Sequence, residues 1–232
     1  MIPDLAQAKA VVRRGLWLTA IASVLVVGAG ILALAFTPIE AHQGLAQKIF
    51  YVHVPAAWSA LFAFSLGGIV SALYLWLRDA RLDLFAASSA EVGVVFSMVM
   101  LTTGPIWGKP IWGTWWSWDA RLTLTLFLFF LFLGYHALRA AVSDRAERAR
   151  LSAVVAIMGL LLVPFIHVSV YLFRTLHPMP VVLKPSAPSL PPEMLRTLLV
   201  SVAATTLLYV GLVTTRYGIA LTAEAGGVTD HD

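Results

Sequence analysis

Six stretches of the sequence are apolar over the length that a membrane-crossing helix needs, and short polar or proline-rich segments separate them. A helix rises 1.5 Å per residue, so about 20 mostly apolar residues cross the roughly 30 Å hydrocarbon layer of a bilayer. We therefore expect an all-α integral membrane protein with six transmembrane helices, at about Gly15–Phe36, Ala56–Leu77, Leu84–Gly104, Leu122–Val142, Ser152–Phe173 and Met194–Thr215.

The composition supports a membrane protein. Of the 232 residues, 59% are hydrophobic and 12% are charged, whereas about a quarter of a soluble domain is charged; mean hydropathy is +0.84. The net charge of +4 does not indicate nucleic-acid binding, because the basic residues lie at the ends of apolar stretches rather than in one patch. We expect one membrane domain, residues 1–222, and a polar, mobile cytoplasmic tail, residues 223–232.

The distribution of basic residues predicts the orientation. With a cytoplasmic N-terminus, ten of the 16 Lys and Arg residues fall on the cytoplasmic side and six on the other, as the positive-inside rule requires. Both termini are then cytoplasmic. The apolar run of the first span exceeds the 7–15 residues of a signal-peptide core, so we expect it to be retained.

Tryptophans concentrate in the outward-facing segment between the third and fourth spans, which we expect to be a loop over Pro105–Asp119. Five of the eight tryptophans lie within twelve residues there, interrupted by Gly and Pro. An interfacial aromatic belt is the plain explanation, but it needs only one or two rings per helix end. We favour a platform for a large, flat, apolar ligand, because ligand sites are lined by aromatic side chains. Asp119 directly precedes an apolar run and is expected to cap the fourth helix, and to fix the end of the loop or pair with Arg121.

The run from Trp112 to Thr123, WGTWWSWDARLT, resembles the WWD signature of haem-handling proteins in bacterial cytochrome c maturation. The six spans, the short length and the segment Tyr51–Trp58, YVHVPAAW, resemble the smaller members of that family. The resemblance implies a protein that binds haem at the periplasmic face of the bacterial inner membrane. It implies a site that includes Trp112, Gly113, Trp115, Trp116, Trp118 and Asp119.

The resemblance also implies two loop histidines as axial ligands of the haem iron. The matching positions are His53, in the first outer loop, and His177, in the third. Two imidazoles give a six-coordinate iron, and closing both axial positions suppresses oxygen chemistry. His42 shares a loop with His53 but lacks the Val-Pro-Ala-Ala context. Because the chain has no cysteine, it cannot attach haem covalently through a C-x-x-C-H segment, and we expect non-covalent haem b.

The haem propionates need polar partners, because unpaired buried charge is costly. Lys48, five residues before His53, and Arg121, two residues after Asp119, are the preferred pair. The alternative is that both are ordinary interfacial side chains.

Two histidines inside the spans raise the alternative of a cytochrome b with haem between helices. At 1.5 Å per residue, His136 lies about 21 Å and His167 about 9 Å below the outer ends of their spans. Axial nitrogens of one haem are only about 4 Å apart. These two side chains therefore cannot easily share one haem.

The expected function is that of a haem carrier, not an enzyme, although help in attaching haem to a chaperone stays open. The resemblance implies delivery to a membrane-anchored haem chaperone, together with ATP-binding cassette transporter subunits and a small membrane subunit. The chain has no G-x-x-x-x-G-K-[ST] nucleotide-binding run. A haem permease is the alternative, for which Glu91 and Pro164 are the conspicuous irregularities within the spans.

Overall fold

The computed structural model describes residues 4–173 and 175–229 and is helical throughout, apart from connecting segments. Six of its helices are long and apolar enough to cross a membrane, which confirms the predicted number of spans. A π-helical turn, Leu32–Phe36, continues the first helix, and a 3-10 turn, Leu45–Ile49, precedes the second. The helices are α1 (Leu5–Ile31), α2 (Phe50–Leu77), α3 (Ala80–Trp112), α4 (Ala120–Ala141), α5 (Arg145–Leu172) and α6 (Pro192–Thr229).

Aspartate side chains mark the starts of several helices. An aspartate before a helix accepts a hydrogen bond from a backbone N–H that has no partner within the first turn. Such caps begin α1, α3, α4 and α5, where the acceptors are Asp4, Asp79, Asp119 and Asp144.

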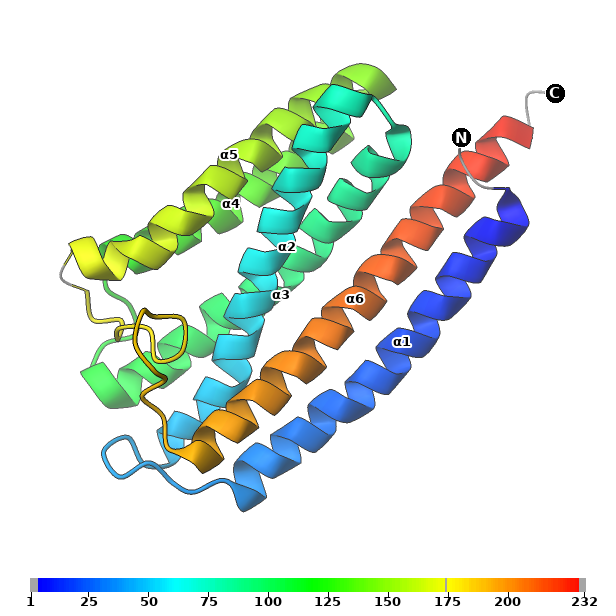
Figure 1. The fold of residues 1–232 in the computed structure, drawn as a ribbon. Coiled ribbons are helices and arrows are strands. Elements are labelled where there is room, and N and C mark those ends of the chain that lie inside the picture. Colours follow the sequence, from blue (N-terminus) through cyan, green and yellow to red (C-terminus); the bar gives the residue numbers. More distant parts are fainter. Residues whose placement is uncertain (1–3, 174, 230–232) are drawn as a thin grey trace.

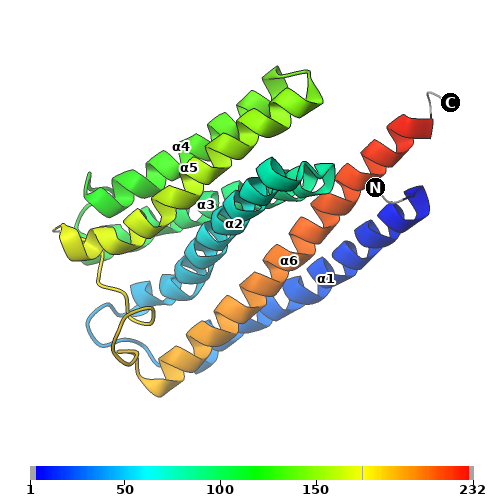
Figure 2. The same cartoon turned by 45° about the horizontal axis from the view of Figure 1, so that its top comes forward.

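The helices form a centre and two flanking pairs (Figures 1 and 2). Helices α2 and α3 pack against each other in the centre, α1 runs along α6 on one side, and α4 runs along α5 on the other. Helix α5 contacts α2, and α6 contacts both α2 and α3. The flanking pairs are therefore held through the central helices.

Two glycines allow aromatic rings to join the centre to the α4–α5 pair. The rings of Phe64 and Phe132 stack with centroids 3.9 Å apart. A Cβ atom at Gly93 would lie 2.7 Å from Cε1 of Phe64, and one at Gly159 would lie 2.5 Å from Cε2 of Phe132. Any larger residue at either position would displace a ring from the best-buried part of the core.

The two ends of the bundle differ in their connections. The segments 37–49, 113–119 and 175–191 lie at one end, which we call the loop end, and both termini lie at the other (Figure 1). Short turns join the helices at the end where the termini lie. There the guanidinium of Arg139 donates two hydrogen bonds to the carboxylate of Asp83, at 2.6 and 2.9 Å, in a mostly buried ion pair. Large connections, which can build a binding site, are thus at the loop end.

The helices are longer than the apolar stretches, and this corrects two expectations. The segment Pro105–Trp112 is the last part of α3 rather than a loop, and α2 begins at Phe50, so that His53 is helical. Residues 223–229 continue α6, and the last three residues of the predicted tail, 230–232, lie outside the described part of the chain. Pro55 lies inside α2, and Pro105 and Pro110 lie inside α3, although proline ordinarily breaks a helix. Membrane helices tolerate proline when neighbouring groups bond to the backbone carbonyls that it leaves without a donor.

Candidate haem site

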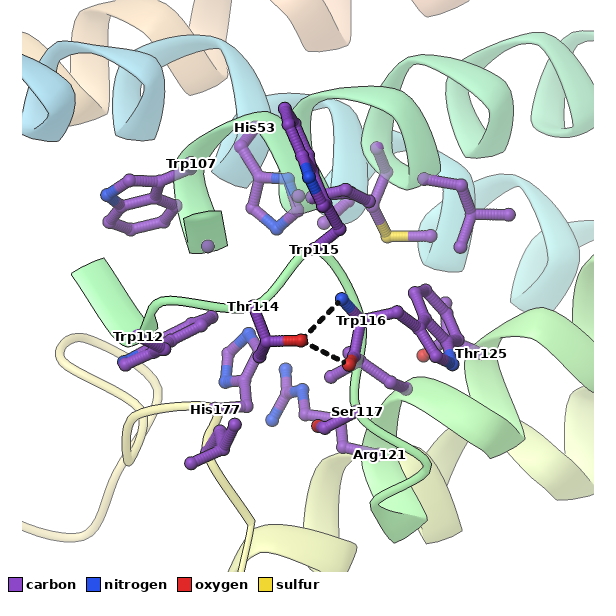
Figure 3. Close-up of a pocket in the computed structure, with 18 of the residues that line it drawn as sticks. His53, Trp107, Trp112, Thr114, Trp115, Trp116, Ser117, Arg121, Thr125 and His177 are labelled. Atoms are coloured by element: carbon purple, nitrogen blue, oxygen red, sulfur yellow. Dashed lines mark hydrogen bonds between the residues drawn. The ribbon is translucent and has the colours of Figure 1, made fainter. Parts of the chain in front are cut away.

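A pocket at the loop end brings together residues from four helices and two connecting segments. Its empty space is about 800 Å³ when the open solvent at its mouth is included, and the cavity itself accounts for about 80 Å³. Six of the ten predicted site residues line it: His53, Trp112, Trp115, Trp116, Arg121 and His177. In Figure 3, His53 and His177 lie on opposite sides of the segment that carries Thr114 and Trp115.

His53 is held by helices. It lies in the first turn of α2, and its ring packs edge-on against Trp107 of α3, with ring centroids 5.8 Å apart. A Cβ atom at Gly104 would lie 3.2 Å from Cε1 of His53, so that the absence of a side chain there makes room for the imidazole. Nδ1 of His53 lies 3.0 Å from the hydroxyl oxygen of Thr103.

His177 is held within an irregular segment. Its Nδ1 donates a hydrogen bond to the carbonyl oxygen of Pro178 at 2.9 Å, which leaves Nε2 free to bind a metal. Burial lowers the pKa of His177 to about 4, and the charge of Arg121 acts in the same direction. The imidazole is therefore neutral at physiological pH and has the lone pair that iron coordination needs.

Three tryptophans and a threonine shape the wall between the histidines. Trp112 ends α3, and Trp115 and Trp116 follow in the connecting segment. The Thr114 hydroxyl donates to the carbonyl of Trp116 at 2.8 Å, which fixes the turn between them. The indole Nε1 of Trp116 is buried and has no hydrogen-bond partner among the described residues. The wall thus offers aromatic surface and one unsatisfied donor.

Arg121 places a positive charge in the pocket. Its guanidinium points into the space beside His177 (Figure 3). Within the described part of the chain, Nη1 of Arg121 is buried without a hydrogen-bond partner. Buried donors of this kind are costly unless an acceptor pairs with them. The pocket is therefore suited to a ligand that combines flat apolar surface with an anionic group.

Asp119 and Gly113 shape the site without lining it. As predicted, Asp119 caps α4, with Oδ1 accepting from the N–H of Leu122 at 3.0 Å. Oδ2 accepts from the Ser117 hydroxyl at 2.9 Å and from the N–H of Leu176 at 3.2 Å. Asp119 thereby ties the residue before His177 to the start of α4. Gly113 ends α3 with a φ of 75°, a left-handed conformation that glycine adopts at little cost.

Two of the predicted site residues lie elsewhere. Lys48 is buried, and its ammonium group donates to the carbonyl oxygens of Ala33 at 2.8 Å, Thr37, and Pro38 at 3.2 Å. It closes the end of the first helix and does not line the pocket. Trp118 is 77% exposed and lies outside the pocket, where its ring packs edge-on against Trp116.

The other histidines in the described part of the chain do not line the pocket. His42 is exposed on the segment after α1, and its backbone N–H donates to Glu40. His136 lies on α4 towards the terminal end, and His167 lies on α5 with its ring 6.3 Å from that of Tyr171. The pocket therefore contains two histidines, His53 and His177.

Comparison with known proteins shows the family to which the chain belongs. The family model of CcmC, heme exporter protein C, matches residues 4–226. The chain belongs to this family. It is 40% identical over 210 residues to heme exporter protein C of Haemophilus influenzae, covering 89% of this chain and 85% of that protein. It is also 40% identical over 196 residues to heme exporter protein C of Bradyrhizobium diazoefficiens, covering 84% and 74%.

A relative outside the bacteria is similar as well. A putative cytochrome c biosynthesis ccmC-like mitochondrial protein of Marchantia polymorpha is 39% identical over 146 residues, which are 63% of this chain and 61% of that protein. Membership of the heme exporter protein C family makes this chain a multi-span membrane component of haem handling for cytochrome c biogenesis. It is a transport or handling component by family.

The pocket also contains residues that the sequence did not single out for the site. Gly104, Trp107 and Gly108 all come from the last turns of α3. Gly104 and Gly108 are four residues apart, which is the spacing of residues on one face of a helix. This signal was obscured because Pro105 and Pro110 are typical of a break between helices. Thr125 also lines the pocket, from α4.

Proposed function

We propose that this heme exporter protein C family member binds haem b non-covalently in the pocket at the loop end and passes it to a membrane-anchored haem chaperone. The observation that carries the proposal is the meeting of His53, His177 and Arg121 around one aromatic-lined pocket. His53 and His177 would be the axial ligands. Arg121 and the indole N–H of Trp116 would pair with propionate oxygens.

The residues of the pocket fit haem by their chemistry. Haem bound there would supply an iron with two axial positions, and two imidazoles would fill both, which suppresses oxygen chemistry. The tryptophans exclude water from the faces of the ring, and Arg121 orients its charged edge. The chain lacks cysteine, so this binding involves no thioether bond. Release then requires only ligand exchange and no bond cleavage within the porphyrin.

We further propose that the loop end faces the periplasm across the bacterial inner membrane, with both termini in the cytoplasm. The excess of Lys and Arg at the terminal end supports this orientation. The partners are then the haem chaperone, ATP-binding cassette transporter subunits and a small membrane subunit, in keeping with the family name. Glu91, the intramembrane carboxylate that a permease would use, is paired with Arg216 of α6 at 2.7 Å.

Absorption spectroscopy of the purified protein tests the ligand assignment. We expect a six-coordinate, low-spin spectrum that His53→Ala and His177→Ala each abolish. His42→Ala is the matched control, because this exposed histidine lies outside the pocket. If both pocket variants keep the low-spin spectrum, the assignment is wrong.

The absence of native cysteine allows a direct test of orientation. Ser186→Cys places a thiol in the exposed connection at the loop end, and Ser143→Cys places one in the turn at the terminal end. In intact inner-membrane spheroplasts, a membrane-impermeant maleimide should label the first variant, and the second only after lysis. The reverse pattern would invert the proposed orientation.

A further inference from the structure

Thr103 contacts His53, although it lies outside both the Trp112–Thr123 run and the Tyr51–Trp58 segment. It lies on α3, one residue before the glycine against which the imidazole rests. The distance from its Oγ1 to Nδ1 of His53 is 3.0 Å, which is a normal hydrogen bond. The pair joins α3 to the first turn of α2.

The direction of this hydrogen bond follows from the other contacts of Thr103. Its hydroxyl lies 2.7 Å from the carbonyl oxygen of Val99, four residues earlier, and 3.3 Å from that of Met100. Carbonyl oxygens only accept, and a hydroxyl has one proton to donate. The proton is therefore directed to the backbone of α3, and the Thr103 oxygen accepts from His53.

The consequence is a defined tautomer of His53. A neutral imidazole carries one proton, and with that proton on Nδ1 the lone pair is on Nε2. A hydrogen bond from the remote ring nitrogen fixes the orientation of a metal-binding imidazole and raises its basicity. Thr103, Gly104 and Trp107 all belong to α3, so one rigid element sets the position, the tautomer and the orientation of the ring.

His177 has no comparable support from a helix. Its Nδ1 donates to the carbonyl of the adjacent Pro178, so this hydrogen bond moves together with the segment that bears both residues. The link from that segment to α4 runs through the backbone N–H of Leu176 and Asp119. The imidazole of His177 can therefore leave the pocket without disturbing a helix, whereas that of His53 cannot.

We propose that Thr103 is a positioning residue that holds His53 in its Nδ1–H tautomer with Nε2 towards the pocket, making His53 the axial ligand retained when His177 is exchanged. This inference rests on the proposed function for its haem-dependent part. The tautomer itself is a property of the protein without haem. The two parts can therefore be tested separately.

The experiment compares Thr103→Val, Thr103→Ser and Thr102→Val in the full-length protein in detergent. Valine matches the shape of threonine but cannot accept a hydrogen bond, and serine keeps the acceptor. Thr102, the residue before Thr103, is the matched control. It is exposed on α3, and its hydroxyl donates to the carbonyl oxygen of Met98. In haem-free protein, ¹⁵N spectra of labelled histidine should show the Nδ1–H form of His53, assigned by its loss in His53→Ala. Thr103→Val should alter this signal alone.

The haem-loaded proteins provide a second readout. We expect Thr103→Val to release haem to a soluble haem-capturing apoprotein about 10- to 100-fold faster, the range found for partners of metal-ligating histidines. Its reduction potential should rise, because a less basic ligand stabilises ferric iron less; a tenfold relative loss of ferric affinity corresponds to about 59 mV. Thr103→Ser and Thr102→Val should behave as the unmodified protein.

The outcomes separate the inference from the proposed function. An unchanged His53 signal in Thr103→Val, or a Nε2–H signal in the unmodified protein, overturns the positioning role of Thr103. A changed signal with unchanged potential and haem release overturns the claim that His53 is the retained ligand. Failure of the proposed function appears elsewhere, as a low-spin spectrum that survives both histidine substitutions.

Discussion

The two histidines of the pocket are supported in different ways. His53 lies on α2 and is positioned by three residues of α3, whereas His177 lies on the segment 175–191 and forms a hydrogen bond with its own neighbour, Pro178. A helix packed on a helix holds a side chain more precisely than a connecting segment does. The difference teaches that one pocket can combine a fixed histidine with a movable one, which suits the proposed function of binding haem and giving it up.

The largest expected difference between the His53 and His177 sides of the pocket is in haem retention when each histidine is removed and free imidazole is added. We expect His177→Gly to keep haem and to regain a low-spin spectrum with imidazole, because the retained His53 still anchors the iron. His53→Gly should lose at least about tenfold in haem occupancy during purification. Haem content and absorption spectra measure both. If the two variants retain haem equally, the proposed difference between a fixed His53 and a movable His177 is contradicted.

Asp119→Ala should loosen the His177 side. The substitution removes the cap of α4, worth about 1 kcal/mol, and also the hydrogen bond from the N–H of Leu176. We expect faster hydrogen exchange over residues 175–191, unchanged exchange in α2, and a several-fold lower haem occupancy.

Asp144→Ala is the control for this experiment. Asp144 caps α5 at the terminal end by accepting from the N–H of Glu147 at 2.7 Å, and so loses an equivalent bond far from the pocket. It should reduce stability similarly without changing exchange over residues 175–191. If Asp119→Ala changes exchange only within α4, the link to His177 has no energetic weight.

Gly104→Ala should produce the smallest effect, on the His53 side. The new methyl group would lie 3.2 Å from Cε1 of His53, so the ring must move by a few tenths of an ångström. Overpacking on this scale costs about 1 kcal/mol, which is roughly a fivefold loss of haem affinity. Gly134→Ala, where no atom lies within 4 Å, is the control and should leave haem affinity unchanged. Haem titration measures both.

The number of spans and six of the residues that line the pocket could be predicted from sequence, for physical reasons. Apolar stretches of sufficient length report directly on the bilayer, and Asp119 lies at a position where a cap is chemically expected. The C-terminal end of α3 could not be predicted, because Pro105 and Pro110 ordinarily break a helix. In the structure α3 continues through both prolines to Trp112.

The role predicted for Lys48 rests on its proximity to His53 in sequence. Its separation of five residues from His53 suggested a shared pocket, but the chain before α2 turns so that the ammonium group reaches the carbonyls at the end of the first helix. Thr103 was missed for the opposite reason. It lies 50 residues from His53 in sequence, and only the packing of α2 on α3 brings the two together.

The unsatisfied nitrogens of Arg121 and Trp116 have a consequence for the lifetime of the protein in the membrane. Each buried donor without an acceptor costs about 1–3 kcal/mol. A ligand that supplies acceptors removes this cost and stabilises the folded chain by mass action as its concentration rises above the dissociation constant. Under the proposed function, haem would be this ligand, the abundance of the folded protein would be coupled to haem supply, and quality-control proteases would remove it sooner in haem-starved cells.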